Sequence, residues 1–216
     1  MNVRLLNFRL YVITGEEYHP NRPLLEVMRE ALEGGADFIQ LRDKTSTKRE
    51  ILEKARKLRE LTIQYNVPFI VNDHVDIALA VDADGVHLGQ DDLPLKEARK
   101  IIGDKIIGIS THSIEQARKA QEEGADYIGV GPIFPTQTKK HAKPVTLSYL
   151  REVVKEISIP FVPIGGIKLH NVDEVLDAGA KSVCVVSEVV GSSDVKGVCE
   201  AFIKKIKARE QHDAYS

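Results

Sequence analysis

The chain has 216 residues, of which 43% are hydrophobic and 29% are charged, so it can form one large globular domain or two small ones. Its 30 basic residues nearly balance its 32 acidic residues, which argues against a nucleic-acid or membrane partner. The sequence also shows no apolar run of about 20 residues, no signal-peptide pattern and no zinc-like cysteine spacing. We expect a cytoplasmic enzyme, and the sequence leaves room for a homo-oligomer.

Eight short apolar segments recur along the chain and predict β-strands. Each is nearly continuous in hydrophobicity, which is typical of parallel strands that are covered on both faces. In chain order the expected strands are 8–14, 38–42, 69–73, 85–89, 106–111, 127–131, 161–166 and 182–187.

Helix-like segments alternate with these strands. In the first of them, 21–35, the residues Leu24, Met28 and Leu32 share one helical face, and Pro23 stands near its start. Seven more helices are expected at 48–65, 75–81, 94–102, 113–124, 147–157, 171–179 and 195–210.

An internal repeat joins every second helix to the strand that follows it. The helix ends in "GAD" or a near copy and a strand begins at once, as in "GGADFIQL", "VDADGVHL", "EGADYIGV" and "AGAKSVCV". Four copies of a two-βα unit predict eight alternating pairs, which right-handed crossovers close into a (β/α)8 TIM barrel. The alternative, a doubly wound open sheet, rarely needs eight strands in a chain of this length.

The barrel is expected to occupy residues 1–208 as a single domain, followed by a polar, frayed tail at 209–216. Pro163 conflicts locally with this prediction, because it lies inside the seventh strand and has no backbone N–H for the sheet. We therefore expect a bulge or an early turn at Pro163.

Polar residues gather where the expected strands end, and in a (β/α)8 barrel this end carries the active site. The segments at these strand ends are "QLRDK" (40–44), "NDH" (72–74), "GQDD" (89–92), "STH" (110–112), "GPIFPTQTKK" (131–140), "GG" (165–166) and "VS" (186–187).

Two aspartates are candidate metal ligands. Asp73 and Asp92 can hold a hard divalent ion such as Mg²⁺, which typically takes one or two carboxylates together with phosphate oxygens. A plainer interpretation is that each aspartate caps the helix that follows it. His87 alternates within a strand and is more typical of a packed core residue than of a ligand.

Other residues at the same end suit phosphate groups. Arg42, Lys44 and Lys139 can bind a polyanion, and the backbone N–H groups of Gly166 and Ser187 can bind a separate monophosphate. A solvated loop and ordinary turn glycines are the plainer alternatives. Taken together, the residues favour a metal-assisted reaction on a diphosphate with a second phosphorylated substrate nearby.

At these residues the chain resembles the thiamine phosphate synthase family. The matching strings are "QLRDK", "NDHVDIALAVDADGVHLGQDD", "STH", "DYIGVGPIFPTQTKK", "IPFVPIGGI" and "VVS", in this order and over nearly the whole chain. The resemblance implies a transferase that joins 4-amino-2-methyl-5-hydroxymethylpyrimidine diphosphate to a thiazole phosphate. It also implies Mg²⁺ as cofactor, pyrophosphate as leaving group and a dissociative displacement without a covalent nucleophile.

The resemblance further implies a role for each matching residue. The metal ligands are Asp73 and Asp92. The catalytic residues are Arg42, Lys44, Ser110 and Lys139. The pyrimidine diphosphate is bound by Gln40, Leu41, Arg42, Asp43, Lys44, Asn72, Ser110 and Lys139. The thiazole phosphate is bound by Thr136, Gln137, Thr138, Gly166, Val186 and Ser187.

The chain departs from the family pattern on the thiazole side. Pro163 and Glu188 stand where small residues are usual, and "HAKPVTLSYL" lacks a glycine after its proline.

Three other functions compete with the coupling reaction. A related enzyme isomerises the thiazole phosphate, a sugar-phosphate isomerase shares the barrel, and a non-catalytic barrel would bind ligands without turnover. The full set of charged residues at the strand ends favours coupling.

Overall fold

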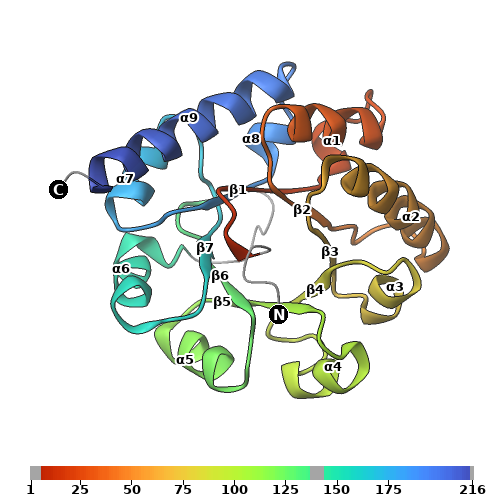
Figure 1. Ribbon diagram of the computed structural model, residues 1–216, viewed down its shortest axis with the longest axis horizontal. Helices are drawn as coiled ribbons and strands as arrows, with labels where there is room; N and C mark the ends of the chain where they lie inside the picture. The colour runs from red at the N-terminus through yellow and green to blue at the C-terminus, as the bar shows by residue number, and fades with distance from the viewer. Residues whose placement is uncertain (1–5, 137–143, 215–216) are drawn as a thin grey trace.

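The structure is a computed structural model, and it describes residues 6–136 and 144–214. Within these residues eight parallel strands form one sheet in the order β7-β6-β5-β4-β3-β2-β1-β8. An isolated bridge between Ile164 and Cys184 joins the two ends of the sheet. Figure 1 shows the strands at the centre of the molecule and the helices as a ring around them. The predicted (β/α)8 barrel is therefore confirmed.

The observed elements follow the predicted alternation. The strands are β1 (Leu10–Ile13), β2 (Phe38–Leu41), β3 (Phe69–Asn72), β4 (Gly85–Leu88), β5 (Ile106–Thr111), β6 (Tyr127–Val130), β7 (Phe161–Pro163) and β8 (Val183–Val185). The predicted helices appear as α1 (Leu24–Glu33), α2 (Lys48–Tyr65), α3 (Val75–Ala80), α4 (Leu95–Ile102), α5 (Ile114–Glu122), α6 (Thr146–Glu156), α7 (Val172–Asp177) and α9 (Val195–Ala214).

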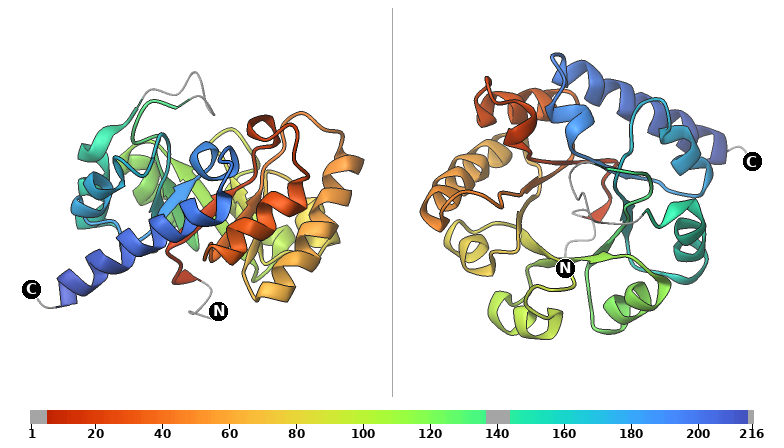
Figure 2. Two further views of the ribbon diagram at one scale, coloured as in Figure 1. Left: turned by 90° about the horizontal axis from the view of Figure 1, so that it is seen from above. Right: turned by 180° about the vertical axis from the view of Figure 1, so that it is seen from behind.

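Two short elements were not predicted. A 3₁₀ turn, η2 (Glu16–Tyr18), follows β1, and a one-turn helix, α8 (Ser187–Val190), follows β8. Both are too short to carry a helical period of hydrophobic residues, so periodicity could not reveal them. Both lie at the end of the barrel where the strands end, which Figure 2 shows from the side.

The last helix is longer than the sequence suggested. α9 continues to Ala214, past residue 208 where a frayed tail was expected to begin. Two ion pairs tie this extension to the barrel: Arg9 with Glu210 at 2.9 Å, and Arg209 with Asp177 at 2.8 Å. The polar residues of this segment thus hold it as helix, and the predicted boundary at 208 does not coincide with the helix end.

Two layers of buried side chains hold the barrel together. The larger layer lies between strands and helices and is mostly aliphatic. The smaller layer fills the inside of the barrel and contains four aromatic rings, from Phe8, Tyr11, Phe38 and Tyr127. The rings of Phe8 and Phe38 stack with centroids 4.4 Å apart. Because Phe8 precedes β1, this aromatic layer fills the N-terminal part of the barrel and leaves the opposite end open for a site.

Pro163 ends its strand, as the sequence predicted. It is the last residue of β7, where it is in register with Val130 of β6. The sheet continues for one further bond, because the N–H of Ile164 donates to the Val130 carbonyl at 3.0 Å. Gly165 and Gly166 follow with φ of 101° and 65°, backbone conformations that glycine adopts more readily than other residues.

Candidate active site

A cavity opens at the carboxyl ends of the strands, and all eight strands or the residues just after them contribute to its lining. Because every strand is parallel, their carboxyl ends meet at the same end of the barrel. Several predicted site residues line this cavity, namely Gln40, Arg42, Asn72, Ser110, Thr136, Gly166, Val186 and Ser187. Gln137, Thr138 and Lys139 lie outside the residues that the structure describes.

The strand β2 directs alternate residues to opposite sides. Gln40 and Arg42 line the cavity, whereas Leu41 is 1% exposed and packs in the layer between strands and helices. Any contact of Leu41 with a ligand in the cavity is therefore limited to its backbone. The backbone of Arg42 is fixed by Thr14, whose hydroxyl accepts from the Arg42 N–H at 2.9 Å and donates to the Arg42 carbonyl at 3.1 Å.

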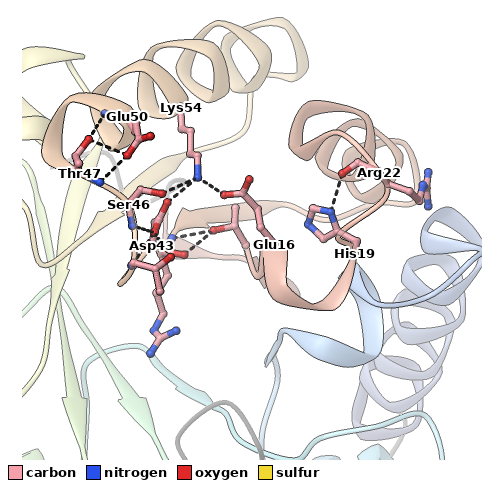
Figure 3. Close-up of polar contacts among 11 residues, drawn as sticks. Glu16, His19, Arg22, Asp43, Ser46, Thr47, Glu50 and Lys54 are labelled. Atoms are coloured by element: carbon pink, nitrogen blue, oxygen red, sulfur yellow. Dashed lines mark hydrogen bonds and ion pairs between the residues drawn. The ribbon is translucent and has the colours of Figure 1, made fainter.

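Asp43 holds its own loop together. Figure 3 shows its carboxylate beside Ser46 and Lys54, with Glu16 of η2 on the other side of the same ammonium group. Lys54 lies 2.7 Å from Asp43, and the Ser46 N–H donates to the carboxylate at 2.9 Å. Burial raises the pKa of Asp43, but the bonds from Lys54 and Ser46 outweigh it and lower the pKa below its usual range. Asp43 thus stabilises the loop that presents Arg42 and Lys44.

Asp73 follows β3 in an unusual backbone conformation. Its φ is 63°, a left-handed value that aspartate tolerates better than most residues, and its N–H donates to the His87 carbonyl at 2.9 Å. The side chain is 16% exposed and forms an ion pair with Lys44. Burial raises the pKa of Asp73, Lys44 opposes this shift, and the neighbouring Asp92 adds to it. The two carboxylates are therefore close enough to interact.

Neither aspartate caps a helix, so the plainer interpretation of both residues is wrong. The N-cap of α3 is His74 and that of α4 is Pro94, and neither helix has a side-chain cap. Asp92 instead accepts a hydrogen bond of 2.7 Å from the N–H of Gly89. The pair of carboxylates beside Lys44 is left without a role in helix capping.

The donor set at Asp73 and Asp92 fits a magnesium ion that is completed by substrate. Among the described residues no group of three or more His, Cys, Asp or Glu side chains gathers as a metal site. Mg²⁺ does not require one, because it is usually bound through one or two carboxylates together with substrate phosphates and water. The arrangement thus suits an ion that enters with a diphosphate better than a resident ion held by the protein alone.

Ser110 and His87 form a second polar group in the cavity lining. The hydroxyl of Ser110 lies 2.8 Å from Nε2 of His87, whose Nδ1 lies 2.9 Å from the Tyr127 hydroxyl. His87 is 9% exposed, in keeping with the packed residue that the sequence suggested, yet it also lines the cavity. Its role beside Ser110 was missed, because the strand pattern gives its direction but not its partner. Gln90 Nε2 donates to the Ser110 carbonyl at 2.7 Å.

The opposite side of the cavity is built mainly from backbone. The loops after β6 and β7 bond to each other, with the Phe134 N–H donating to the Gly165 carbonyl at 3.0 Å. A Cβ on Gly166 would lie 2.5 Å from the Pro135 carbonyl oxygen, so the close approach of the two loops requires glycine there. The Asn171 side chain donates to the Gly166 carbonyl at 3.0 Å and fixes the turn.

The short helix α8 completes this side. Val186 and Ser187 line the cavity where α8 begins. Glu188, one of the departures from the family pattern, points to the neighbouring loop and accepts from the Leu169 N–H at 3.2 Å. Glu188 thus supports the loop after β7, and its size is accommodated at that position.

Two further findings concern the whole of the described chain. Cys184 and Cys199 are buried free thiols, and burial raises the pKa of both. No helix within the described ranges is long and apolar enough to cross a membrane.

Comparison with known proteins gives consistent matches over this architecture. The family model described as thiamine monophosphate synthase matches residues 10–189. A thiamine-phosphate synthase of Halalkalibacterium halodurans is 65% identical over 205 residues, which is 94% of this chain and 97% of that protein. One of Shouchella clausii is 60% identical over 206 residues, covering 94% of this chain and 99% of that protein.

A solved structure agrees in fold as well as in sequence. Thiamine phosphate pyrophosphorylase from Pyrococcus furiosus superposes with a TM-score of 0.89 and 44% identity. The superposition covers 96% of this chain and 99% of that one.

Proposed function

The chain belongs to the thiamine monophosphate synthase family, and from this premise we propose how its residues carry out the reaction. The protein is a transferase that joins 4-amino-2-methyl-5-hydroxymethylpyrimidine diphosphate to a thiazole phosphate. The products are thiamine phosphate and pyrophosphate.

The first step is loss of the diphosphate. The bond between the exocyclic methylene carbon and the diphosphate oxygen breaks, and the electron pair leaves with the oxygen. The amino-pyrimidine ring stabilises the positive charge left on the methylene. Arg42 and Lys44 bind the departing anion, and Lys139, outside the described residues, is assigned the same role by its position in the sequence.

Asp73 and Asp92 are the groups that would hold Mg²⁺ beside this anion. The ion, when bound, neutralises negative charge that develops on the leaving diphosphate. Asp73 also keeps Lys44 oriented, because it forms an ion pair with the Lys44 ammonium. The pairing makes Lys44 available at the same place as the metal ligands.

The second step is attack by the thiazole nitrogen. Its lone pair forms the new carbon–nitrogen bond, and no proton moves at the reacting atoms, so the chain needs no general base. Thr136, Gly166, Val186 and Ser187 hold the thiazole phosphate on the far side of the cavity, where the lining is partly backbone and also includes Lys168. Gln137 and Thr138 are assigned to the same group from the sequence. Holding the nucleophile in line supplies much of the rate enhancement.

Gln40, Asn72 and Ser110 line the cavity between these two sides and are assigned to the pyrimidine ring. Asp43 belongs to the same set through its loop rather than through direct contact, because its carboxylate faces Lys54. Leu41 contributes at most a backbone contact.

The observation that carries this proposal is the pair of interacting carboxylates next to the cavity. Two like charges in a half-buried place repel each other, and neither carboxylate caps a helix. A divalent cation with a polyanionic substrate would remove the repulsion.

We further propose that the reaction takes place in the cytoplasm on small substrates, without a nucleic-acid or membrane partner. The two free buried thiols support a reducing compartment.

The direct experiment combines purified protein with both phosphorylated substrates and Mg²⁺. Thiamine phosphate and pyrophosphate should appear in equal amounts, and neither should form when one substrate is left out or when EDTA removes the metal. Isomerisation of the thiazole phosphate without coupling would place the protein with the tautomerases. Binding of both substrates without any product would identify a non-catalytic barrel.

A further inference from the structure

Five polar groups form one unbroken chain of hydrogen bonds across the inside of the barrel. Gln40 Nε2 lies 2.6 Å from the Tyr11 hydroxyl, and the Tyr11 hydroxyl lies 2.8 Å from that of Tyr127. The Tyr127 hydroxyl lies 2.9 Å from His87 Nδ1, and His87 Nε2 lies 2.8 Å from the Ser110 hydroxyl. This chain of hydrogen bonds therefore links Gln40 of β2 to Ser110 of β5 through three buried residues.

The sheet register builds the middle of this chain. His87 of β4 is in register with Gly108 of β5, and Gly108 is in register with Tyr127 of β6. A Cβ on Gly108 would lie 2.1 Å from Cζ of Tyr127 and 2.4 Å from its hydroxyl oxygen. The absence of a side chain at Gly108 thus lets the Tyr127 ring cross over β5 and reach His87 on the next strand.

The direction of the chain follows from one end. An amide nitrogen can only donate, so Tyr11 accepts from Gln40, and the Tyr127 oxygen, 2.8 Å away, is in place to accept the proton of Tyr11. Tyr127 in turn donates to Nδ1 of His87, which leaves the imidazole proton on Nε2. His87 then donates to the oxygen of Ser110. Burial raises the pKa of both tyrosines, which keeps their hydroxyl protons in place.

We propose that Tyr11, Tyr127 and His87 are positioning residues that fix the proton of His87 on Nε2 and thereby make the Ser110 hydroxyl a hydrogen-bond donor toward the cavity. Gln40, at the other end, has its amide oxygen left to accept. The cavity floor then offers a donor and an acceptor at set places, and a ligand must present the complementary pair. Its effect on the pyrimidine diphosphate rests on the proposed function, whereas the proton position does not.

The competing arrangement runs the other way. If the amide of Gln40 were turned, its oxygen would accept from Tyr11, each proton would reverse, and His87 would carry its proton on Nδ1. Ser110 would then donate to His87 and could only accept from a ligand. The location of a single proton on His87 distinguishes the two directions.

The test is ¹⁵N NMR of histidine-labelled full-length protein at neutral pH, with His87 assigned by its loss in His87→Asn. We expect the proton on Nε2 and Nδ1 as a hydrogen-bonded acceptor. In Tyr127→Phe the Nδ1 signal should move toward that of an imidazole without this bond. A wild-type proton on Nδ1 would overturn the proposal, and this result is independent of whether the protein couples its substrates.

Kinetics test the consequence for the ligand. Tyr127→Phe should raise KM for the pyrimidine diphosphate about fivefold, as expected for one weakened hydrogen bond, and leave KM for the thiazole phosphate within about twofold. Tyr149→Phe is the matched control. It also removes a buried hydroxyl, which lies 2.6 Å from the Thr111 hydroxyl and takes no part in the chain of hydrogen bonds from Gln40 to Ser110. A Tyr127→Phe protein with the wild-type His87 signal and pyrimidine KM would refute the positioning role.

Discussion

The two sides of the cavity are built from different materials. One side, which we call the diphosphate rim, consists of the charged residues Arg42, Lys44, Asp73 and Asp92, of which Arg42 lines the cavity and the others lie on the loops after β2, β3 and β4. The other, the monophosphate rim, consists of Thr136, Gly166, Val186 and Ser187, which offer hydroxyl and backbone groups. Under the proposed function, this difference would let one barrel end bind two anions separately, one mainly through charged side chains and the other mainly through the shape of the backbone.

The diphosphate rim depends on a layer of supporting ion pairs. Lys44 pairs with Asp73, and behind them Lys54 joins Glu16 to Asp43. Ligand binding and catalysis at the diphosphate rim should therefore depend on charge, on pH and on the metal concentration. Neutralising one residue of these ion pairs should disturb the charge balance without changing the backbone.

The monophosphate rim depends on close contact between loops. Gly165 and Gly166 have positive φ, and added Cβ atoms would lie 2.4 Å from Pro132 and 2.5 Å from the Pro135 carbonyl oxygen. Ligand binding at the monophosphate rim should therefore respond more strongly to side-chain volume than to charge. A single substitution can therefore remove one of these two kinds of support and leave the other in place.

The largest effect is expected from Asp92→Asn. Removing one charge from the expected metal ligands should lower kcat about a hundredfold, or about 3 kcal/mol in the barrier, and raise the Mg²⁺ concentration needed for half-maximal rate. Tm should stay near that of the wild type, because asparagine can still accept from the Gly89 N–H and no longer repels Asp73. The measurements are kcat against Mg²⁺ concentration and thermal unfolding.

The control for this variant is Asp76→Asn. Asp76 is an exposed carboxylate on α3 that pairs with Lys48 away from the cavity lining. Its kcat and Mg²⁺ requirement should match the wild type. Wild-type activity of Asp92→Asn at ordinary Mg²⁺ concentration would contradict the assignment of metal ligands to the diphosphate rim.

A smaller effect is expected from Lys54→Met. Lys54 does not line the cavity, so it acts through the loop that carries Arg42 and Lys44. The buried Asp43 carboxylate loses its partner, which should lower the free energy of unfolding by about 2 kcal/mol at neutral pH. KM for the pyrimidine diphosphate should rise about threefold, as expected for a loop that is less well held. Lys48 lies on the same helix as Lys54 and forms an exposed ion pair with Asp76 of α3, so Lys48→Met should change neither.

The same variant has a predictable pH dependence. The folded-state pKa of Asp43 is lowered overall, because the bonds from Lys54 and Ser46 outweigh burial. Its contribution to stability is therefore fully present above about pH 4 and is lost as the pH falls below that value. Urea unfolding between about pH 5 and pH 2 should show a smaller acid-induced loss in Lys54→Met than in the wild type. An equal loss in both proteins would show that Lys54 does not set this pKa.

Sequence patterns predicted the barrel because most residues of its strands are buried. Apolar runs and the repeated "GAD" turns depend on local chemistry, and all eight strands appear where they were expected. The elements that were missed, η2 and α8, are single turns whose form depends on the loops packed against them. The helix past residue 208 depends on partners such as Arg9 and Asp177, which are far away in sequence.

The candidate site could be predicted only where its residues directly follow a predicted strand. Position alone placed Arg42, Asn72 and Ser110 at one end of the barrel, and the structure brings all three to one cavity. Position could not show that Asp43 turns to Lys54, or that His87 bonds to Ser110. Those contacts join different strands or a loop and a helix, so they require the three-dimensional distances.

The central claim is that the two rims serve different substrates, and a crossed kinetic measurement tests it most directly. KM for both substrates is measured in Arg42→Met and in Gly166→Ala, with Tm recorded to confirm that each variant is folded. Arg42→Met should raise KM for the pyrimidine diphosphate about tenfold, as expected for the loss of a charged hydrogen-bond donor, and leave the thiazole KM within about twofold. Gly166→Ala should do the reverse, because its Cβ would meet the Pro135 carbonyl oxygen at the monophosphate rim. Equal increases in both KM values in both variants would contradict the division of the cavity into two rims.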